Sequence, residues 1–251
     1  MNTFSPRPMV VVKQSSASHC LECDARHRSV CNAIGDRDIE RLSAVANPRK
    51  LERGQVFIEE GRPATDFFNI TGGTAKLYKM LPDGRQQITG FAGTGHFLGL
   101  AVSETYAFTA EAIEPLELCR FSRPKLRGLL DDFPLLEKRL LETACNELVA
   151  AQEQMLLLGR KTARERVASF LASRHGESPP CKGHTERIAL PMTRAEIADY
   201  LGLTIETVSR TLTRFKSEGK IALPTRDEVE ILDPHWLLGV AAGQDSHSSF
   251  V

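Results

Sequence analysis

The sequence predicts an α+β protein with a strand-rich N-terminal part, one long helix and a C-terminal helix-turn-helix. Turn signals recur between short apolar segments over residues 49–121, Gly and Pro are absent from 135–158, and two capped helical segments occupy 191–223. The predicted boundaries are 1–18 for a flexible tail, 19–133 for a cysteine-rich segment and β domain, 134–160 for the long helix and 161–240 for a winged helix-turn-helix.

The composition is that of a globular protein large enough to bury a hydrophobic core. The chain has 251 residues, of which 41% are hydrophobic and 25% charged, so it does not need disulfides for stability. The longest apolar run near the start, residues 9–12, is too short for a signal peptide, and no window reaches the roughly 18 apolar residues of a membrane span. We therefore expect a cytoplasmic protein that has no membrane partner and keeps its cysteines reduced.

Positive charge is concentrated in the C-terminal part of the chain. Residues 160–220 contain twelve Lys or Arg against seven Asp or Glu, although the net charge of the whole chain is zero. A basic segment beside an acidic one suggests a phosphate-binding module attached to a second domain. A solvated helix face would give the same count, so charge alone leaves both interpretations open.

The segment 49–121 has the pattern of an antiparallel sandwich or barrel. Short apolar or alternating segments such as "VFI", "FFNI" and "AKLYKM" are separated by glycine-containing turns at nearly regular spacing. Asp83-Gly84 is a suitable two-residue hairpin turn, because both residues tolerate a positive φ.

The long helix carries an apolar seam with a period of about 3.5 residues. The seam consists of Leu141, Ala144, Leu148, Ala151, Met155 and Leu158. It could pack on its own domain, but its narrowness and its position between two domains favour the same helix of a second subunit. We therefore predict a homodimer with these six residues in its interface.

The segment 191–223 has the layout of a helix-turn-helix. Thr193 and Glu196 predict a capping box, Gly202 closes the first helix with a positive φ, and Thr204 caps a second helix that ends before Gly219. Residues 220–232 then predict a β-hairpin, or wing, beside the second helix.

The second helix of this motif has an apolar and a polar face. Ile205, Val208, Leu212 and Phe215 form the predicted apolar stripe. The predicted double-stranded DNA contacts are Glu206, Ser209, Arg210, Thr204 and Thr213, with Lys216 as a phosphate contact. Arg suits the O6/N7 edge of guanine, and Glu can accept from cytosine N4. An amphipathic helix with a solvated outer face is the alternative.

Three cysteines, Cys20, Cys23 and Cys31, are clustered near the N-terminus. In a reduced compartment such a cluster indicates metal ligands or redox groups, and the residues alone leave zinc, iron–sulfur and a thiol–disulfide pair open. Cys145 is expected to be buried in the long helix, and His19 to be solvated. Cys181 receives no predicted role.

The chain resembles the Crp/Fnr family of bacterial transcription regulators from Cys20 to Leu232. The stretch "LGLTIETVSR" is the most specific match, because Glu206, Ser209 and Arg210 follow the E-x-x-S-R pattern of the Fnr branch. The resemblance implies an N-terminal β-roll sensor domain, a dimerisation helix and a winged helix-turn-helix that binds palindromic TTGAT-type sites. The stretch 95–112 contains no Arg or Lys, so we do not expect cyclic-nucleotide binding.

The same resemblance implies an oxygen-responsive activator rather than an enzyme. Fnr-type oxygen sensors hold a [4Fe–4S] cluster with three N-terminal cysteines and one in the β-roll, which corresponds here to Cys20, Cys23, Cys31 and Cys119. Cys119 lies on the strand face opposite Leu116 and Leu118, so it need not be a core residue. The intact cluster would favour the dimer, and the Asp83-Gly84 hairpin is a candidate RNA polymerase contact. The alternatives are a regulator of this family that senses a small molecule, haem or thiol oxidation, and a zinc protein with four cysteine ligands.

Overall fold

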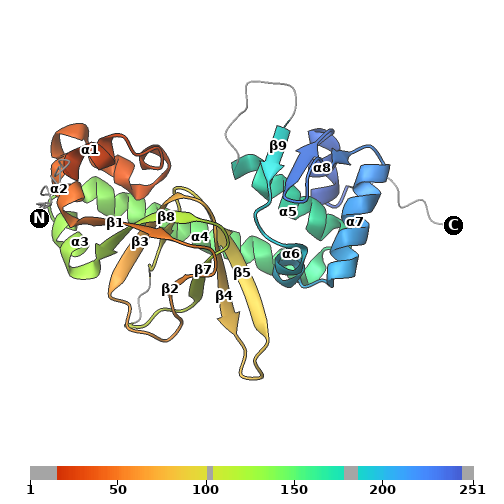
Figure 1. Ribbon diagram of the computed structural model, residues 1–251, viewed down its shortest axis with the longest axis horizontal. Coiled ribbons are helices and arrows are strands. Elements are labelled where there is room, and N and C mark those ends of the chain that lie inside the picture. The colour runs from red at the N-terminus through yellow and green to blue at the C-terminus, as the bar shows by residue number, and fades with distance from the viewer. Residues whose placement is uncertain (1–15, 101–103, 178–185, 245–251) are drawn as a thin grey trace, which may run out of the picture.

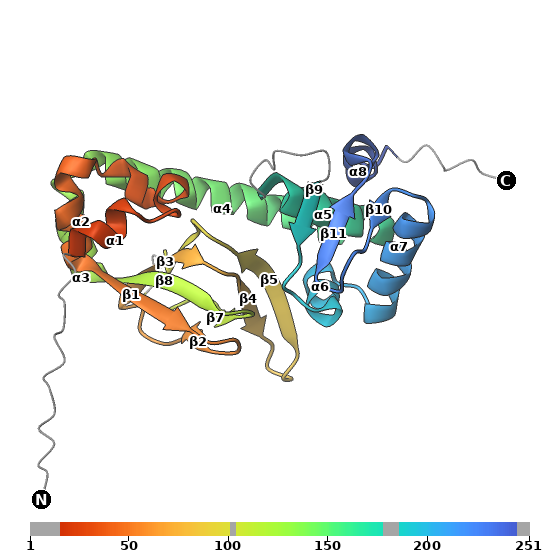
Figure 2. The same ribbon diagram turned by 45° about the horizontal axis from the view of Figure 1, so that its top comes forward.

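The computed structural model describes residues 16–100, 104–177 and 186–244. A β domain and a smaller C-terminal domain lie at opposite ends of one long helix, α4 (Figures 1 and 2). This arrangement confirms the predicted fold class. Part of the predicted tail, residues 1–15, and Cys181 lie outside the described residues, and helix α1 already begins at Ser16.

The β domain contains four-stranded antiparallel sheets of order β1-β8-β3-β6 and β2-β7-β4-β5. Their strands are β1 Ala46–Leu51, β2 Val56–Ile58, β3 Asp66–Gly72, β4 Ala75–Met80, β5 Gln86–Ala92, β6 Phe97–Leu98, β7 Thr109–Ala112 and β8 Leu116–Ser122. Along β8, Leu116 and Leu118 belong to the core between the sheets. Cys119 and Phe121 lie on the opposite face, as the alternation of a strand requires.

Short helices cover the outer face of the first sheet. They are α1 Ser16–Leu21, the 3-10 helices η1 Arg26–Arg28, η2 Val30–Ala33 and η3 Asp36–Asp38, and the helices α2 Ile39–Val45 and α3 Arg123–Leu130. Figure 2 shows the N-terminal members of this group, α1 and α2, between the sheet and the first turns of α4. The covered face is a second hydrophobic core. Cys119 is buried within it, so the expectation that Cys119 need not be core was wrong.

Helix α4, Pro134–Arg160, connects the two domains. Leu141, Leu148 and Met155 of the predicted seam are exposed by 61–71%, and Ala144 and Ala151 are also exposed. Leu158, by contrast, packs against the core of the C-terminal domain. Cys145 is exposed in the single chain, which corrects the expectation of a buried residue. Within the described ranges, no helix is long and apolar enough to cross a membrane.

In its described residues, the C-terminal domain has four helices and a three-stranded sheet of order β10-β11-β9. Its elements are α5 Ala163–Glu177, β9 Glu186–Ala189, α6 Arg194–Leu201, α7 Ile205–Ser217, β10 Ile221–Ala222, β11 Glu228–Ile231 and α8 Pro234–Ala241. β10 and β11 form the predicted wing hairpin. Thr193 and Glu196 form the predicted capping box, and Gly202 ends α6 with a φ of 60°.

Candidate metal centre and nucleic-acid interface

The four cysteines proposed as ligands line one cavity. Cys20 lies in α1, Cys23 follows α1, and Cys31 lies in η2. Cys119 comes from β8, where it faces Pro48 of β1 and Asn69 of β3 across the sheet. The fold thus brings the N-terminal cysteines together with one that is about ninety positions away in the chain. The five cysteines of the described segments are all free thiols.

Burial raises the pKa of three of these thiols, Cys20, Cys31 and Cys119, and makes them hard to ionise in the present arrangement. Burial, and then the proximity of Cys31, Cys20 and Cys23, raises the pKa of the Cys119 thiol to about 12. Burial also raises the pKa of the Cys31 thiol to about 11, despite its hydrogen bond with Ser29. Several thiolates can be held together in such a place when a cationic centre neutralises them. The donor set therefore fits a metal centre with thiolate ligands.

The cavity also contains polar groups that lack a complete set of partners. The Asn69 side chain donates a weak hydrogen bond to Cys31 Sγ at 3.9 Å, while its buried Oδ1 has no partner. Arg26 pairs with Asp36 at 2.6 Å, but its buried Nε is also unpartnered. The cavity measures about 20 Å³, which is room for about one water molecule. A cluster would therefore require the N-terminal helices to move outward from the sheet.

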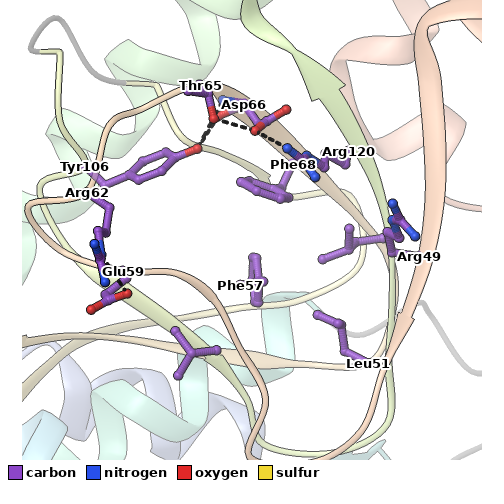
Figure 3. A pocket seen from close by; sticks show the side chains of 12 residues that line it. Arg49, Leu51, Phe57, Glu59, Arg62, Thr65, Asp66, Phe68, Tyr106 and Arg120 are labelled. Atoms are coloured by element: carbon purple, nitrogen blue, oxygen red, sulfur yellow. Dashed lines mark hydrogen bonds and ion pairs between the residues drawn. The ribbon is translucent and has the colours of Figure 1, made fainter.

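A larger cavity of about 500 Å³ opens on the other face of the same sheet. Figure 3 shows Phe57 and Phe68 in its middle, with Arg120 and Asp66 on one side and Arg49 on another. The sequence did not predict this cavity, although Arg120 stands at the inward position of an alternating strand.

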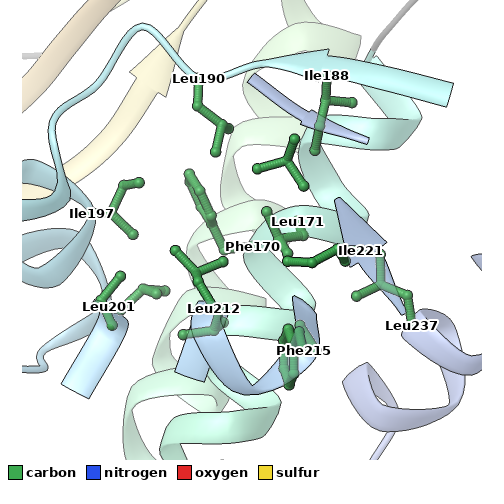
Figure 4. Packing of buried hydrophobic residues seen from close by; sticks show 14 of the residues in the cluster. Phe170, Leu171, Ile188, Leu190, Ile197, Leu201, Leu212, Phe215, Ile221 and Leu237 are labelled. Atoms are coloured by element: carbon green, nitrogen blue, oxygen red, sulfur yellow. The ribbon is translucent and has the colours of Figure 1, made fainter. Parts of the chain in front are cut away.

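The second helix of the helix-turn-helix, α7, is held by the core of its own domain. Val208, Leu212 and Phe215 are buried, and Figure 4 shows Leu212 and Phe215 among side chains from α5, β10 and α8. Ile205 was predicted to belong to this stripe, but it is 48% exposed. It occupies the first position of α7, where the helix extends beyond the core.

The opposite face of α7 carries the predicted DNA contacts. Glu206, Ser209, Arg210, Thr213 and Lys216 are all exposed. Hydrogen bonds from its own backbone N–H and from the Thr204 hydroxyl lower the pKa of Glu206, so that its carboxylate remains an acceptor. Thr204 also caps the helix, because its hydroxyl accepts from Thr207 N at 3.2 Å.

A group of aromatic and charged side chains holds the C-terminal end of α7. The rings of Phe215 and Trp236 meet edge to face, with centroids 5.0 Å apart, and the Arg164 guanidinium lies over both rings. Arg164 also donates two hydrogen bonds to Glu218, at 2.8 and 3.1 Å. These contacts join the C-terminal end of α7 to α5 and α8.

The contacts between the two domains were not predicted from the sequence. Lys76 of β4 reaches Glu196 of α6 at 3.3 Å. Asp199 of α6 accepts hydrogen bonds from the Ile88 N–H and the Gln86 side chain, at 2.9 and 3.2 Å. The pairs are separated by more than a hundred residues, so no local pattern could have predicted them. They dock the first helix of the helix-turn-helix on the β4–β5 hairpin.

Comparison with protein families divides the chain in the same way as the fold. Residues 48–133 match the cyclic nucleotide-binding domain, and residues 165–239 match the Crp-like helix-turn-helix domain.

Similar full-length proteins are transcription regulators. The nitrogen fixation regulation protein FixK of Bradyrhizobium diazoefficiens is 37% identical over 94% of this chain and 99% of its own length. The transcriptional activator protein FnrL of Cereibacter sphaeroides is 37% identical over 90% of this chain and 93% of its own. The structure of FixK2 from Bradyrhizobium japonicum aligns with a TM-score of 0.73 at 32% identity, covering 78% of this chain and 97% of that one. These relatives are transcription regulators, which confirms the prediction that the protein is not an enzyme. The chain belongs to the Crp/Fnr family of transcription regulators.

Proposed function

We propose that this protein is an oxygen-responsive transcription activator whose four cysteines, Cys20, Cys23, Cys31 and Cys119, hold a [4Fe–4S] cluster. The observation that carries the proposal is that these thiols, from two distant parts of the chain, line one buried cavity. The cluster, when bound, is the group that reacts with oxygen.

The resemblance to the Fnr branch favours a cluster over zinc, because that branch holds a [4Fe–4S] cluster with three N-terminal cysteines and one in the β-roll. Within the part of the chain that the structure describes, no three His, Cys, Asp or Glu side chains lie close enough together to ligate one metal ion, so either kind of metal centre would require the cysteines to move. Sensing by thiol oxidation alone is disfavoured, because Cys20, Cys31 and Cys119 are buried.

The packing offers a route from the cysteines to the dimerisation helix. Cys31 and Cys119 belong to the same core as Leu136 of α4, which is fully buried, and Leu140 packs against that core. An outward movement of the N-terminal helices therefore changes the packing around the start of α4. A cluster that binds the dimer more tightly than the monomer shifts the equilibrium by that difference in affinity.

The remaining parts of the proposal concern partners. Two copies of α4 would pair through the exposed seam, and the two α7 helices would then lie about one DNA turn apart on a palindromic TTGAT-type site. Glu206, Ser209 and Arg210 would contact base edges in the major groove. The tip of the β4–β5 hairpin, with Asp83 and Arg85 exposed, is the proposed RNA polymerase contact. We place this activity in the cytoplasm.

The proposal is tested on protein purified without air. We expect a brown protein with about four iron and four sulfide per subunit, and we expect air to bleach its absorption. Stoichiometric zinc without sulfide, in protein made with ample iron under anaerobic conditions, would reject the cluster.

Single substitutions distinguish the cysteines that bind the proposed cluster from those that do not. Cys119→Ser should abolish stable cluster binding and oxygen-dependent DNA binding. Cys145→Ser is the matched control, because Cys145 is exposed on α4, away from the cavity, and it should retain a normal cluster. The reverse result would show that Cys119 is not the fourth ligand.

A further inference from the structure

The larger cavity has cationic side chains where a sheet core normally has apolar ones. Arg49 of β1 pairs directly with Leu118 of β8, and Arg120 stands two positions further along β8. Both arginines therefore lie on the sheet face of Leu118, which is turned toward the core between the sheets. They are diagonal neighbours, a spacing of about 7–8 Å between Cα atoms that long side chains can bridge.

Apolar residues form the floor of this cavity, and charged residues surround the floor. The floor consists of Leu51, Phe57, Phe68 and Leu118, and Val56, which is 48% exposed, also lines the cavity. The rings of Phe57 and Phe68 meet edge to face, with centroids 5.3 Å apart. Figure 3 shows both rings between the arginines and the Tyr106 side of the cavity. The volume of about 500 Å³ is that of a small-molecule site.

The charged residues of the lining carry one more positive than negative charge. Asp66 accepts from Arg120 at 2.7 Å and from the Thr65 hydroxyl at 2.6 Å, and Glu59 pairs with Arg62 at 3.2 Å. Arg49 has no acidic partner among the residues that the structure describes. Its guanidinium is thus available to an anion at the edge of the apolar floor.

We propose that this cavity binds a small organic acid, with its carboxylate on Arg49 and its apolar body on Phe57 and Phe68. Arg–carboxylate pairs are often bidentate, which fixes the orientation of the acid. The site lies on the opposite sheet face from the cysteines, so it is separate from the proposed cluster. Among the described residues of the stretch 95–112, only Tyr106 lines the cavity, and its hydroxyl donates to the Asp66 carbonyl at 2.9 Å.

Isothermal titration of the full-length protein tests the site with phenylacetate and octanoate as probes. At least one acid should bind saturably, while phenylacetamide, which lacks the charge, and inorganic phosphate, which lacks the apolar body, should bind at least about tenfold more weakly. Saturation-transfer NMR should place the apolar part of the acid against the protein. The proposal is overturned if neither acid binds at about 10 mM, or if the amide or phosphate binds as tightly.

Two variants of the same strand locate the carboxylate. Arg49→Gln removes an exposed side chain that holds no ion pair, so the fold should persist while affinity for the acid falls about tenfold or more. Lys50→Gln is the control, because Lys50 points to the other face of β1 and pairs with Glu117. An unchanged affinity in Arg49→Gln, or an equal loss in both variants, excludes Arg49 as the carboxylate partner.

Discussion

The C-terminal domain holds its proposed DNA contacts on an exposed helix face above its own core, whereas the β domain holds its four cysteines beneath short helices. Glu206 and Arg210 are already exposed, so the proposed contacts with DNA need no rearrangement of α7. The cysteine cavity has room for about one water molecule, and the seam of α4 is exposed in a single chain. One chain thus completes the proposed reading surface, while the proposed sensing part would be completed by a bound group and a second subunit.

The largest effect is expected from removing the support of the reading surface. Phe215 is fully buried and packs on Trp236, so Phe215→Ala should lower the free energy of unfolding of the C-terminal domain by about 3–5 kcal/mol. Denaturant unfolding measures this loss. Ile205→Ala on the same helix is the control, and its exposed side chain should change stability by about 0.5 kcal/mol or less. Equal losses would mean that α7 is not held by the core described above.

The next largest effect is expected in the seam of α4, which is exposed in a single chain and would be buried in the proposed dimer. Leu148 is 61% exposed in the middle of the seam, so Leu148→Glu should leave the monomer folded. In a dimer it would bury a charge, and we expect dimer affinity to fall by about 2 kcal/mol or more in sedimentation equilibrium of cluster-loaded protein. Asn146→Glu introduces the same residue on another face of α4 and should have little effect. Full dimerisation of Leu148→Glu would place the interface elsewhere.

A smaller effect is expected at the exposed face of α7. Arg210→Ala should weaken binding to a TTGAT-type site by about 1–3 kcal/mol per half-site and relax the preference for guanine. Competition binding against every single-base variant of the half-site measures both. An unchanged base preference would mean that α7 does not read bases in this register.

Lys216→Ala provides the contrast within the same helix. Lys216 lies near the end of α7, where a phosphate contact is expected, so its loss should weaken all sequences alike. The slope of log affinity against log salt should become shallower by about one per subunit. A sequence-dependent loss in this variant would reassign Lys216 to base reading.

The same contrast explains how far the sequence predicted the structure. The helix-turn-helix was predicted down to its caps, because Thr193, Glu196, Gly202 and Thr204 act on neighbouring residues. The prediction that Ile205 belongs to the buried stripe of α7 was wrong, because helical periodicity gives the direction of a side chain and not the extent of the core beneath it. That extent depends on how α5 and α8 pack.

Predictions for the β domain depended more on resemblance and were less complete. Strand alternation separated Cys119 from Leu118 correctly, but it could not show that the N-terminal helices cover the outer face. The spacing of the first three cysteines predicted a metal or redox site, while the fourth proposed ligand, Cys119, was predicted only from the family pattern. The contact between Lys76 and Glu196 joins residues 120 positions apart, so no local sequence pattern could predict it.

The smallest expected effect tests this contact between the two domains. The Glu196 side chain is 16% exposed and accepts hydrogen bonds from the Thr193 backbone and hydroxyl and from Lys76. Burial alone would raise the pKa of Glu196, but the hydrogen bonds from Thr193 and the charge of Lys76 outweigh it, and the pKa is lowered below the usual 4.5. The carboxylate therefore stabilises the folded protein above pH 4.5, and this contribution is lost as the pH falls through the lowered pKa.

Glu196→Gln should cost about 1 kcal/mol of stability at neutral pH and flatten the loss of stability on acidification. Denaturant unfolding at a series of pH values from neutral to acidic measures both, and amide exchange in α6 reports on the docking itself. Glu142→Gln is the control, because Glu142 forms an exposed pair with Arg139 on α4. If Glu196→Gln kept the full acid dependence of the natural protein, the carboxylate would not hold α6 to the β4–β5 hairpin. The two domains would then be joined mainly by the rings of Phe91, Phe170 and Tyr200, whose contacts involve no carboxylate.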